Sequence, residues 1–303
     1  MPTSPSVATI DRPAPPDPSP SAASALVSEA SDLRTFPHVV LEVFRLTGLS
    51  QPSVREIEDQ IRRDPVLVSR VLRRVNSAFY GLRHRVDSVA SAIMYLGTRT
   101  LRNVVVMDCL NGYFLDEGAA ARKGVLSRPR LFMHGAAVGT CAQLLSRRLF
   151  ASPGEDAFLA GMVHDIGLLI EAQVREESLK KAFERYAASD APLVECEREF
   201  LGTDHCEVGR ALALKWLFPQ EIADVVARHH DPIDEPAAVA SLCGVIQAAD
   251  YVASVCGGGE AESRIEEPEG AVAEHIQAHA DDFRVLVEDA RREIARAGSL
   301  DWT

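Results

Sequence analysis

Apolar residues recur at helical spacing along most of this chain, and this periodicity limits the possible folds more than any other feature. One stripe follows Asp64-Pro65 and consists of Leu67, Val68, Val71, Leu72 and Val75. Strand-type alternation is scarce, although the apolar run 104–106 would also suit a strand. The sequence therefore predicts an all-α protein.

Residues with strong end preferences mark where several helices begin or stop. Ser53 and Glu56 have the spacing of a capping box. Asp64 precedes a proline suited to a first helical turn, and Gly97 is a typical helix stop. Further helices are predicted over about 131–149, 155–172 and 236–255, with others starting near 204 and 219.

The two ends of the chain differ in composition from its middle. Residues 1–31 are rich in Pro, Ser and Ala, which predicts a disordered tail. Residues 257–303 are acidic and carry a helical stripe, which predicts a helical extension with inward-facing Phe283, Leu286, Val287 and Ile294. The helical region between them spans residues 32–256.

The charge of the chain is negative overall but unevenly spread. Lys and Arg number 32 against 44 Asp and Glu, for a net charge of −12, so nucleic acid is not an expected partner. Residues 51–102, however, hold ten arginines against five acidic residues. Solvated helix faces would account for this excess. The alternative hypothesis is a basic docking face for a protein partner or a phosphate, with Arg70, Arg73 and Arg74 as the candidate residues.

Cysteine usage and hydropathy indicate a cytoplasmic protein. The six cysteines show no C-x-x-C spacing and lie mostly in apolar helical runs, as reduced buried thiols do. The sequence shows neither a secretory signal nor an apolar run long enough to suggest a membrane span.

Histidine and aspartate residues interrupt several of the predicted apolar helices. Taken singly, each is explained by a hydrogen-bonded core histidine or a capping aspartate. Taken together they indicate a metal site, because buried carboxylates need partners and a cation satisfies imidazole and carboxylate at once. Such mixed ligation suits Fe, Mn, Zn or Co, as one ion or two. The candidate ligands are His134, His164, Asp165, His205, His229, His230 and Asp250.

The order of these residues resembles the HD superfamily of metal-dependent phosphohydrolases, and in particular its HDOD branch of bacterial signalling modules. Residues 88–97 read S-V-A-S-A-I-M-Y-L-G, and residues 160–167 read A-G-M-V-H-D-I-G. Further matches are Asp64-Pro65-Val66-Leu67, the stretch from Asn76 to Tyr80, residues 200–209 with Gly202, Asp204, His205 and Glu207, then Trp216, Pro219 and His229-His230.

The resemblance implies a two-lobed helical HDOD domain over 32–256, with an N-terminal lobe of about 32–115 and an HD-like lobe of about 131–256. It implies signal transduction, often linked to cyclic di-GMP. The ligand set of the related HD-GYP phosphodiesterases carries over onto the seven candidate residues. Two features depart from those relatives: Leu168 replaces a lysine, and Asp231-Pro232-Ile233 stands where a Glu and a G-Y-P loop would follow.

Three functions remain as hypotheses. The first is a signalling module that binds a protein or a nucleotide without hydrolysis. The second is a phosphohydrolase or phosphodiesterase with a binuclear His/Asp site, in which Asp165 would be essential to catalysis. The third is an ion that holds the fold, or an iron site that reports redox state or oxygen. Separately, Asn76 to Tyr80 is interpreted as a structural helix-to-turn junction, in preference to a ligand site.

Overall fold

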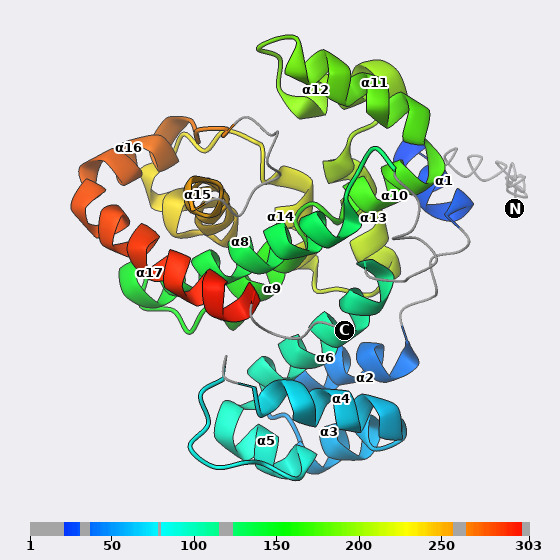
Figure 1. The fold of residues 1–303 in the computed structure, drawn as a ribbon, viewed down its shortest axis with the longest axis vertical. Helices are drawn as coiled ribbons and strands as arrows, with labels where there is room; N and C mark the ends of the chain where they lie inside the picture. The colour runs from blue at the N-terminus through cyan, green and yellow to red at the C-terminus, as the bar shows by residue number, and fades with distance from the viewer. Residues whose placement is uncertain (1–20, 31–36, 78–79, 115–123, 257–264, 299–303) are drawn as a thin grey trace, which may run out of the picture.

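The computed structural model describes residues 21–30, 37–77, 80–114, 124–256 and 265–298, and it contains helices and no strand within these ranges. Figure 1 shows a smaller lobe of early helices beneath a larger lobe that holds the rest. The all-α prediction is confirmed. Residues 104–106 are part of a helix, so the strand alternative is excluded.

The small lobe consists of α2 (His38–Thr47), α3 (Val54–Ile61), α4 (Pro65–Val75), α5 (Val89–Leu96) and α6 (Thr98–Phe114). The predicted helix ends are confirmed. The Ser53 hydroxyl accepts a hydrogen bond from the Glu56 amide at 3.3 Å. One Asp64 oxygen accepts from the first-turn amides of α4 at 2.9 and 3.0 Å, and Gly97 ends α5 with φ of +82°.

A buried carboxylate joins α4 to α6. Asp108, whose side chain is 1% exposed, lies 2.8 Å from Arg70 Nε and 3.1 Å from Arg74 Nε. Two of the three arginines predicted to bind a partner therefore neutralise a charge inside the lobe, because an unpaired carboxylate there would be costly. Arg73, on the same helix, is exposed.

Asn76 fixes the turn that follows α4. Its side-chain amide donates to the carbonyl oxygens of Leu72 and Val86, and its side-chain oxygen accepts from the Val86 amide, all at 2.8 Å. The predicted structural role is thus confirmed for Asn76. Phe79 and Tyr80 are the side chains expected to pack at this junction. Tyr80 is partly buried against the core, and Phe79 lies outside the described residues.

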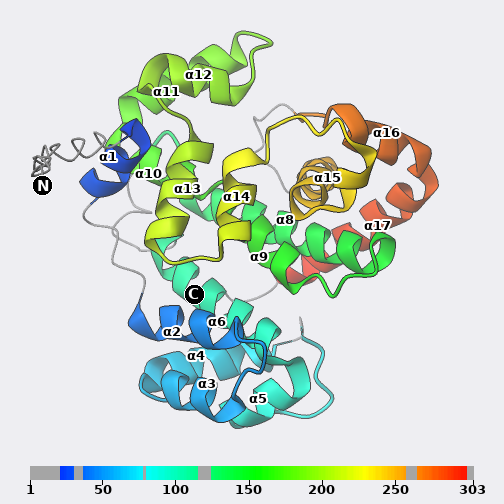
Figure 2. The same cartoon turned by 180° about the vertical axis from the view of Figure 1, so that it is seen from behind.

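Most of the remaining helices form the large lobe, seen from behind in Figure 2. They are α1 (Ala22–Glu29), α8 (Arg128–Leu149), α9 (Glu155–Val163), α10 (Ile166–Val174), α11 (Glu176–Ala187), α12 (Leu193–Leu201), α13 (His205–Lys215), α14 (Gln220–Arg228), the 3-10 helix η1 (Pro236–Ala240), α15 (Leu242–Val255), α16 (Gly270–Ala278) and α17 (Ala280–Gly298). Helices α8, α9 and α15 pack together at its centre.

Two predictions about the chain ends have different outcomes. The disordered tail predicted for 1–31 is wrong for Ala22–Glu29, which forms α1; residues 1–20 and 31 lie outside the described residues. Leu26 and Val27 bury enough apolar surface on the large lobe to order this helix, and Lys215 Nζ donates to the Val27 carbonyl at 3.3 Å. Within the described part of the predicted C-terminal extension, the chain forms α16 and α17.

The single helix predicted over 155–172 is divided in two. Helix α9 ends before His164, and α10 starts after Asp165. The stretch Glu155–Val174 is long and apolar enough to cross a membrane, but 78% of its apolar 18-residue window is buried within the fold, as in a core helix. The helix predicted over 236–255 likewise divides, into η1 and α15.

Glycines allow α8 and α9 to touch through their backbones. A β-carbon added to Gly161 of α9 would lie 2.6 Å from the Cα of Gly139 on α8. One added to Gly135 would lie 2.6 Å from the Met162 carbonyl oxygen. Further along, Gly167 of α10 approaches His205 so closely that a β-carbon there would overlap the His205 carbonyl. These contacts set the helix separations around the candidate site.

Polar contacts from α9 hold the two lobes together. Asp156 lies 2.7 Å from Arg102 Nη2 and 2.9 Å from Arg99 Nη1, both on α6. The Asn103 side-chain amide donates to the Glu155 carbonyl at 2.7 Å. The first turn of α9 is therefore fixed to the small lobe, while its last turn leads directly into the candidate site.

Replacing Gly161 with alanine tests the backbone contact. We expect Gly161→Ala to lower the free energy of unfolding by about 1–3 kcal/mol, because α8 and α9 must separate to admit the methyl group. Gly112→Ala is the matched control: it is also a helical glycine, but nothing lies within 4 Å of its added β-carbon. That control should be neutral or stabilising by about 0.5–1 kcal/mol in urea unfolding. Equal effects would contradict the contact.

Candidate metal centre

The structure brings all seven predicted ligands to one place in the large lobe. His134 comes from α8, and Asp250 from α15. His164 and Asp165 form the junction between α9 and α10, His205 is the first residue of α13, and the pair His229-His230 directly follows α14. Residues up to 116 positions apart in the sequence therefore meet, as the metal-site prediction requires.

Asp165 lies at the centre of this group. Its Oδ2 is 3.1 Å from His164 Nε2 and 3.6 Å from His134 Nε2. Its Oδ1 is 3.3 Å from His229 Nε2 and 3.5 Å from His205 Nε2. The two oxygens of one carboxylate thus face two different pairs of histidines, which is the arrangement of a ligand that bridges two ions.

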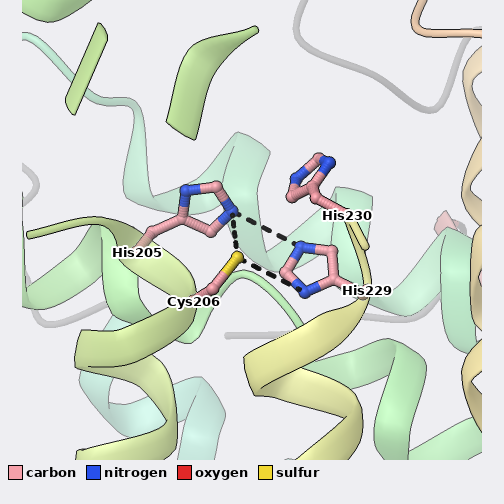
Figure 3. A group of neighbouring side chains, drawn as sticks. All are labelled: His205, Cys206, His229 and His230. Atoms are coloured by element: carbon pink, nitrogen blue, oxygen red, sulfur yellow. Dashed lines mark hydrogen bonds between the residues drawn. The ribbon is translucent and has the colours of Figure 1, made fainter. Parts of the chain in front are cut away.

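The remaining ligands complete the two halves of the group. In the first half, Asp250 Oδ1 lies 3.2 Å from His134 Nε2. In the second half, His205 Nε2 and His229 Nε2 are 3.4 Å apart, and the rings of His229 and His230 are centred 4.3 Å apart. Figure 3 shows this second half. His164, His205 and His229 are buried, whereas His230 and Asp250 lie toward the solvent side.

Hydrogen bonds at Nδ1 orient three of the histidine rings. Nδ1 lies 2.8 Å from the Gly161 carbonyl in His164 and 2.9 Å from the Val226 carbonyl in His229. In His205 it lies 2.7 Å from a Glu197 carboxylate oxygen. Since each of these acceptors holds a proton on Nδ1, each ring can present the lone pair of Nε2 to an ion.

Two buried atoms support the fit of a cation. His164 Nε2 and Asp250 Oδ1 make no hydrogen bond to any described residue. His164 Nε2 nevertheless lies 3.1 Å from Asp165 Oδ2, and Asp250 Oδ1 lies 3.2 Å from His134 Nε2. Atoms that are buried without a hydrogen bond are rare in folded proteins. They face the interior of the cluster, so a divalent ion would satisfy both.

Neighbouring charges shift the pKa values of several residues in the cluster so that His205 and His229 are protonated and Asp165 is ionised. Burial alone would raise the pKa of Asp165, but His164, His229 and His205 hold it well below its usual range. Burial opposes a charge on His229, yet the Cys206 sulfur and Asp165 raise its pKa to about 10. The pKa of His205 is also raised, by Cys206 and Glu197 acting against burial.

The sequence analysis missed Cys206 and Glu197, which contact the cluster, and Glu171, which interacts with Glu197. Cys206 follows His205 directly, and its position beside a candidate ligand was the available signal. Glu197 on α12 binds both the ring and the amide of His205, and nothing in its amphipathic helix indicates this. Glu171 is a fully buried acid within an apolar run; burial and Glu197 raise its pKa well above the usual value.

The structure places the two segments at which the sequence departs from the pattern of the resemblance. Leu168 is buried in the core. The segment after His230 is tied to the C-terminal extension, because the Ile233 carbonyl accepts the Ala271 amide at 2.7 Å. From the same extension, Glu266 Oε2 comes within 3.7 Å of His230 Nδ1.

The helical lobes and the His/Asp cluster define a protein of the HD type. The chain belongs to the HDOD domain family, which it matches over residues 33–232. It is 24% identical over 214 residues to an uncharacterized protein of Treponema pallidum, covering 69% of this chain and 40% of that protein. It is also 24% identical over 145 residues to YuxH, an uncharacterized protein of Bacillus subtilis, covering 48% of this chain and 34% of YuxH. The chain thus spans less than half the length of either relative.

Solved structures share the fold at low identity. An HDOD domain protein of unknown function from Geobacter sulfurreducens has a TM-score of 0.68 at 22% identity, covering 89% of this chain and 97% of that one. A provisionally named phosphohydrolase from Shewanella amazonensis has a TM-score of 0.66 at 24% identity, covering 92% and 97%. A provisionally named signal transduction protein from Marinobacter aquaeolei has 0.64 at 21%, covering 90% and 60%. These likenesses confirm the HDOD fold.

Metal uptake by this cluster should depend on pH. Because the pKa of His229 is about 10, its ring holds a second proton near neutral pH that an incoming ion must displace. We expect the affinity for Zn²⁺ or Mn²⁺ to rise between pH 6 and pH 8, about tenfold per pH unit for each proton displaced. Competition with a chelator dye at several pH values measures this. An affinity independent of pH would contradict the proton displacement.

Proposed function

We propose that this chain is a cytoplasmic signalling module that binds a protein partner or a nucleotide, and whose large lobe holds one or two divalent ions without hydrolysing a substrate. The observation that carries the metal part is the position of Asp165 between two pairs of histidines. The family supports signal transduction, and its resemblance to HD-GYP proteins suggests a link with cyclic di-GMP networks.

The donor set supports a transition metal over magnesium. Five imidazoles and two carboxylates surround the centre, and such mixed nitrogen and oxygen ligation suits Fe, Mn, Zn or Co. When bound, ions in such a site supply Lewis acidity and lower the pKa of bound water. The chain contributes the orientation: the carbonyls of Gly161 and Val226 and the carboxylate of Glu197 fix three rings toward the centre.

The surroundings of the centre favour binding over hydrolysis. A phosphodiester substrate needs positive charge for its phosphate, and the lysine that serves the related phosphodiesterases is replaced by the buried Leu168. Where their substrate loop would follow His230, the chain packs at Ile233 against the start of α16. Both features support a centre that holds ions inside a signalling domain.

A metal-dependent phosphohydrolase is the second candidate. It is favoured by the bridging position of Asp165 and by the solvent-side placement of His230 and Asp250, which would let a substrate approach. An ion that only holds the fold, or an iron that senses redox state or oxygen, would use the same ligands. These functions differ in turnover and in what metal removal does to stability.

Metal content and turnover of the purified chain test the proposal. We expect at least one transition-metal ion per chain by mass spectrometry, loss of that metal in Asp165→Ala, and no hydrolysis of cyclic di-GMP or bis(p-nitrophenyl) phosphate. The matched control is Asp231→Ala, which removes an exposed carboxylate next to His230. A metal-free chain would overturn the metal centre. Turnover that Asp165→Ala abolishes and Asp231→Ala retains would establish the hydrolase instead.

Arg73 offers a clean test of the docking hypothesis. Reversing Arg70 or Arg74 would remove one of the two cations that neutralise the buried Asp108 and would place a second acid beside it. This change would destabilise the small lobe, so loss of binding there would be ambiguous. Arg73→Glu changes an exposed charge on the same helix and should leave the thermal midpoint within about 1 °C. If α4 binds an acidic partner face, crosslinking to that partner in cells should fall several-fold. Unchanged crosslinking would refute docking through Arg73.

A further inference from the structure

Cys206 occupies a position in the second half of the centre that none of the predicted ligands fills. It lies in the first turn of α13, next to His205, and is only 4% exposed. Its sulfur is 3.6 Å from His205 Nε2 and 3.9 Å from His229 Nδ1. Figure 3 shows the thiol directed between the two imidazole rings and away from the α13 backbone.

Two separations, from the Cys206 sulfur to His205 Nε2 and from His205 Nε2 to His229 Nε2, are those of ligands around one small ion. Zinc bonds of about 2.0–2.1 Å to nitrogen and 2.3 Å to sulfur place tetrahedral donor atoms roughly 3.3–3.6 Å apart. The two Nε2 atoms of His205 and His229 are 3.4 Å apart, and the sulfur is 3.6 Å from the first of them. One ligand atom from each of His205, Cys206, His229 and His230 lies within 4.8 Å of the other three.

We propose that Cys206 is a thiolate ligand of the ion bound by His205 and His229. This inference rests on the proposed metal centre and adds a ligand to it. The cluster then has two chemically different halves: His134, His164 and Asp250 offer only nitrogen and oxygen, while the other half adds sulfur. Asp165 presents one oxygen to each half.

Because the two halves of the cluster differ in their donor atoms, they favour different metal ions. A thiolate favours zinc and other thiophilic metals, whereas imidazole with two carboxylates accommodates manganese or ferrous iron. The sulfur half is therefore the first to fill with Zn²⁺ or Co²⁺, and the oxygen half keeps its capacity for a harder ion. If both halves bind an ion, the thiolate makes the ion nearer Cys206 the more thiophilic of the two.

Other cysteines in the lobe have different surroundings. The Cys243 thiol donates to the Arg228 carbonyl at 3.2 Å, and Cys256 donates to the Val287 carbonyl at 3.5 Å. Cys206, by contrast, faces two imidazoles that other groups already orient through Nδ1. A thiol in that position gains more from ligation than from a weak hydrogen bond to a ring.

Cobalt substitution tests the thiolate directly. The metal-free full chain is titrated with Co²⁺, and absorption is followed in the near ultraviolet, where thiolate-to-cobalt charge transfer appears. We expect this band in the natural chain, its loss in Cys206→Ser, and its retention in Cys109→Ser, which changes a thiol in the small lobe. Zinc affinity should fall roughly tenfold or more in Cys206→Ser only.

The outcomes separate this inference from the proposed function. Cobalt binding without the charge-transfer band, or with a band that persists in Cys206→Ser, overturns the thiolate ligand and leaves the metal centre standing. No cobalt binding by any variant overturns both. If Cys206→Ser fails to fold, X-ray absorption of the zinc-loaded natural chain decides: a sulfur scatterer at about 2.3 Å supports the ligand, and its absence refutes it.

Discussion

Backbone contact at glycine positions is the constraint on which the rest of the large lobe depends. Gly139 and Gly161 allow α8 and α9 to approach more closely than side chains would permit, and Gly167 does the same for α10 and α13. Each contact lies within a few residues of a candidate ligand. His134 precedes Gly135, and the Gly161 carbonyl itself binds the ring of His164. The helix spacing and the ligand spacing therefore have one cause.

The apolar core of the large lobe also contains several buried ionisable side chains. Glu197, Glu171, His164 and His205 are buried together at the meeting point of four helices. Removing so many ionisable groups from water is unfavourable unless each is neutralised. Imidazolium and carboxylate groups do this in the absence of an ion, and a divalent cation does it with fewer protons. The polarity is a cost to the fold that a bound divalent ion would offset.

Much of this could be predicted from local sequence signals. Caps such as Asp64 and Gly97 are local interactions, and the seven candidate ligands stand out because a polar or charged group in an apolar helix needs a partner. The break at His164-Asp165 was not predictable from periodicity, because apolar residues continue in register on both sides of it. Glu197 and the arginines around Asp108 were missed or misread for a different reason. Their partners lie on other helices, so only the tertiary structure shows which charged side chains are paired inside the fold.

The break between α9 and α10 places His164 and Asp165 of the candidate centre where these two helices are connected. Upstream of it, α9 is fixed to the small lobe through Asp156. Downstream, α10 is fixed to α13 at Gly167. Anything that turns one lobe against the other therefore acts on the residues that join these helices, His164 and Asp165. If an ion binds there, a partner that changed the lobe angle would alter the ion affinity, and the ion would alter the partner affinity by the same factor.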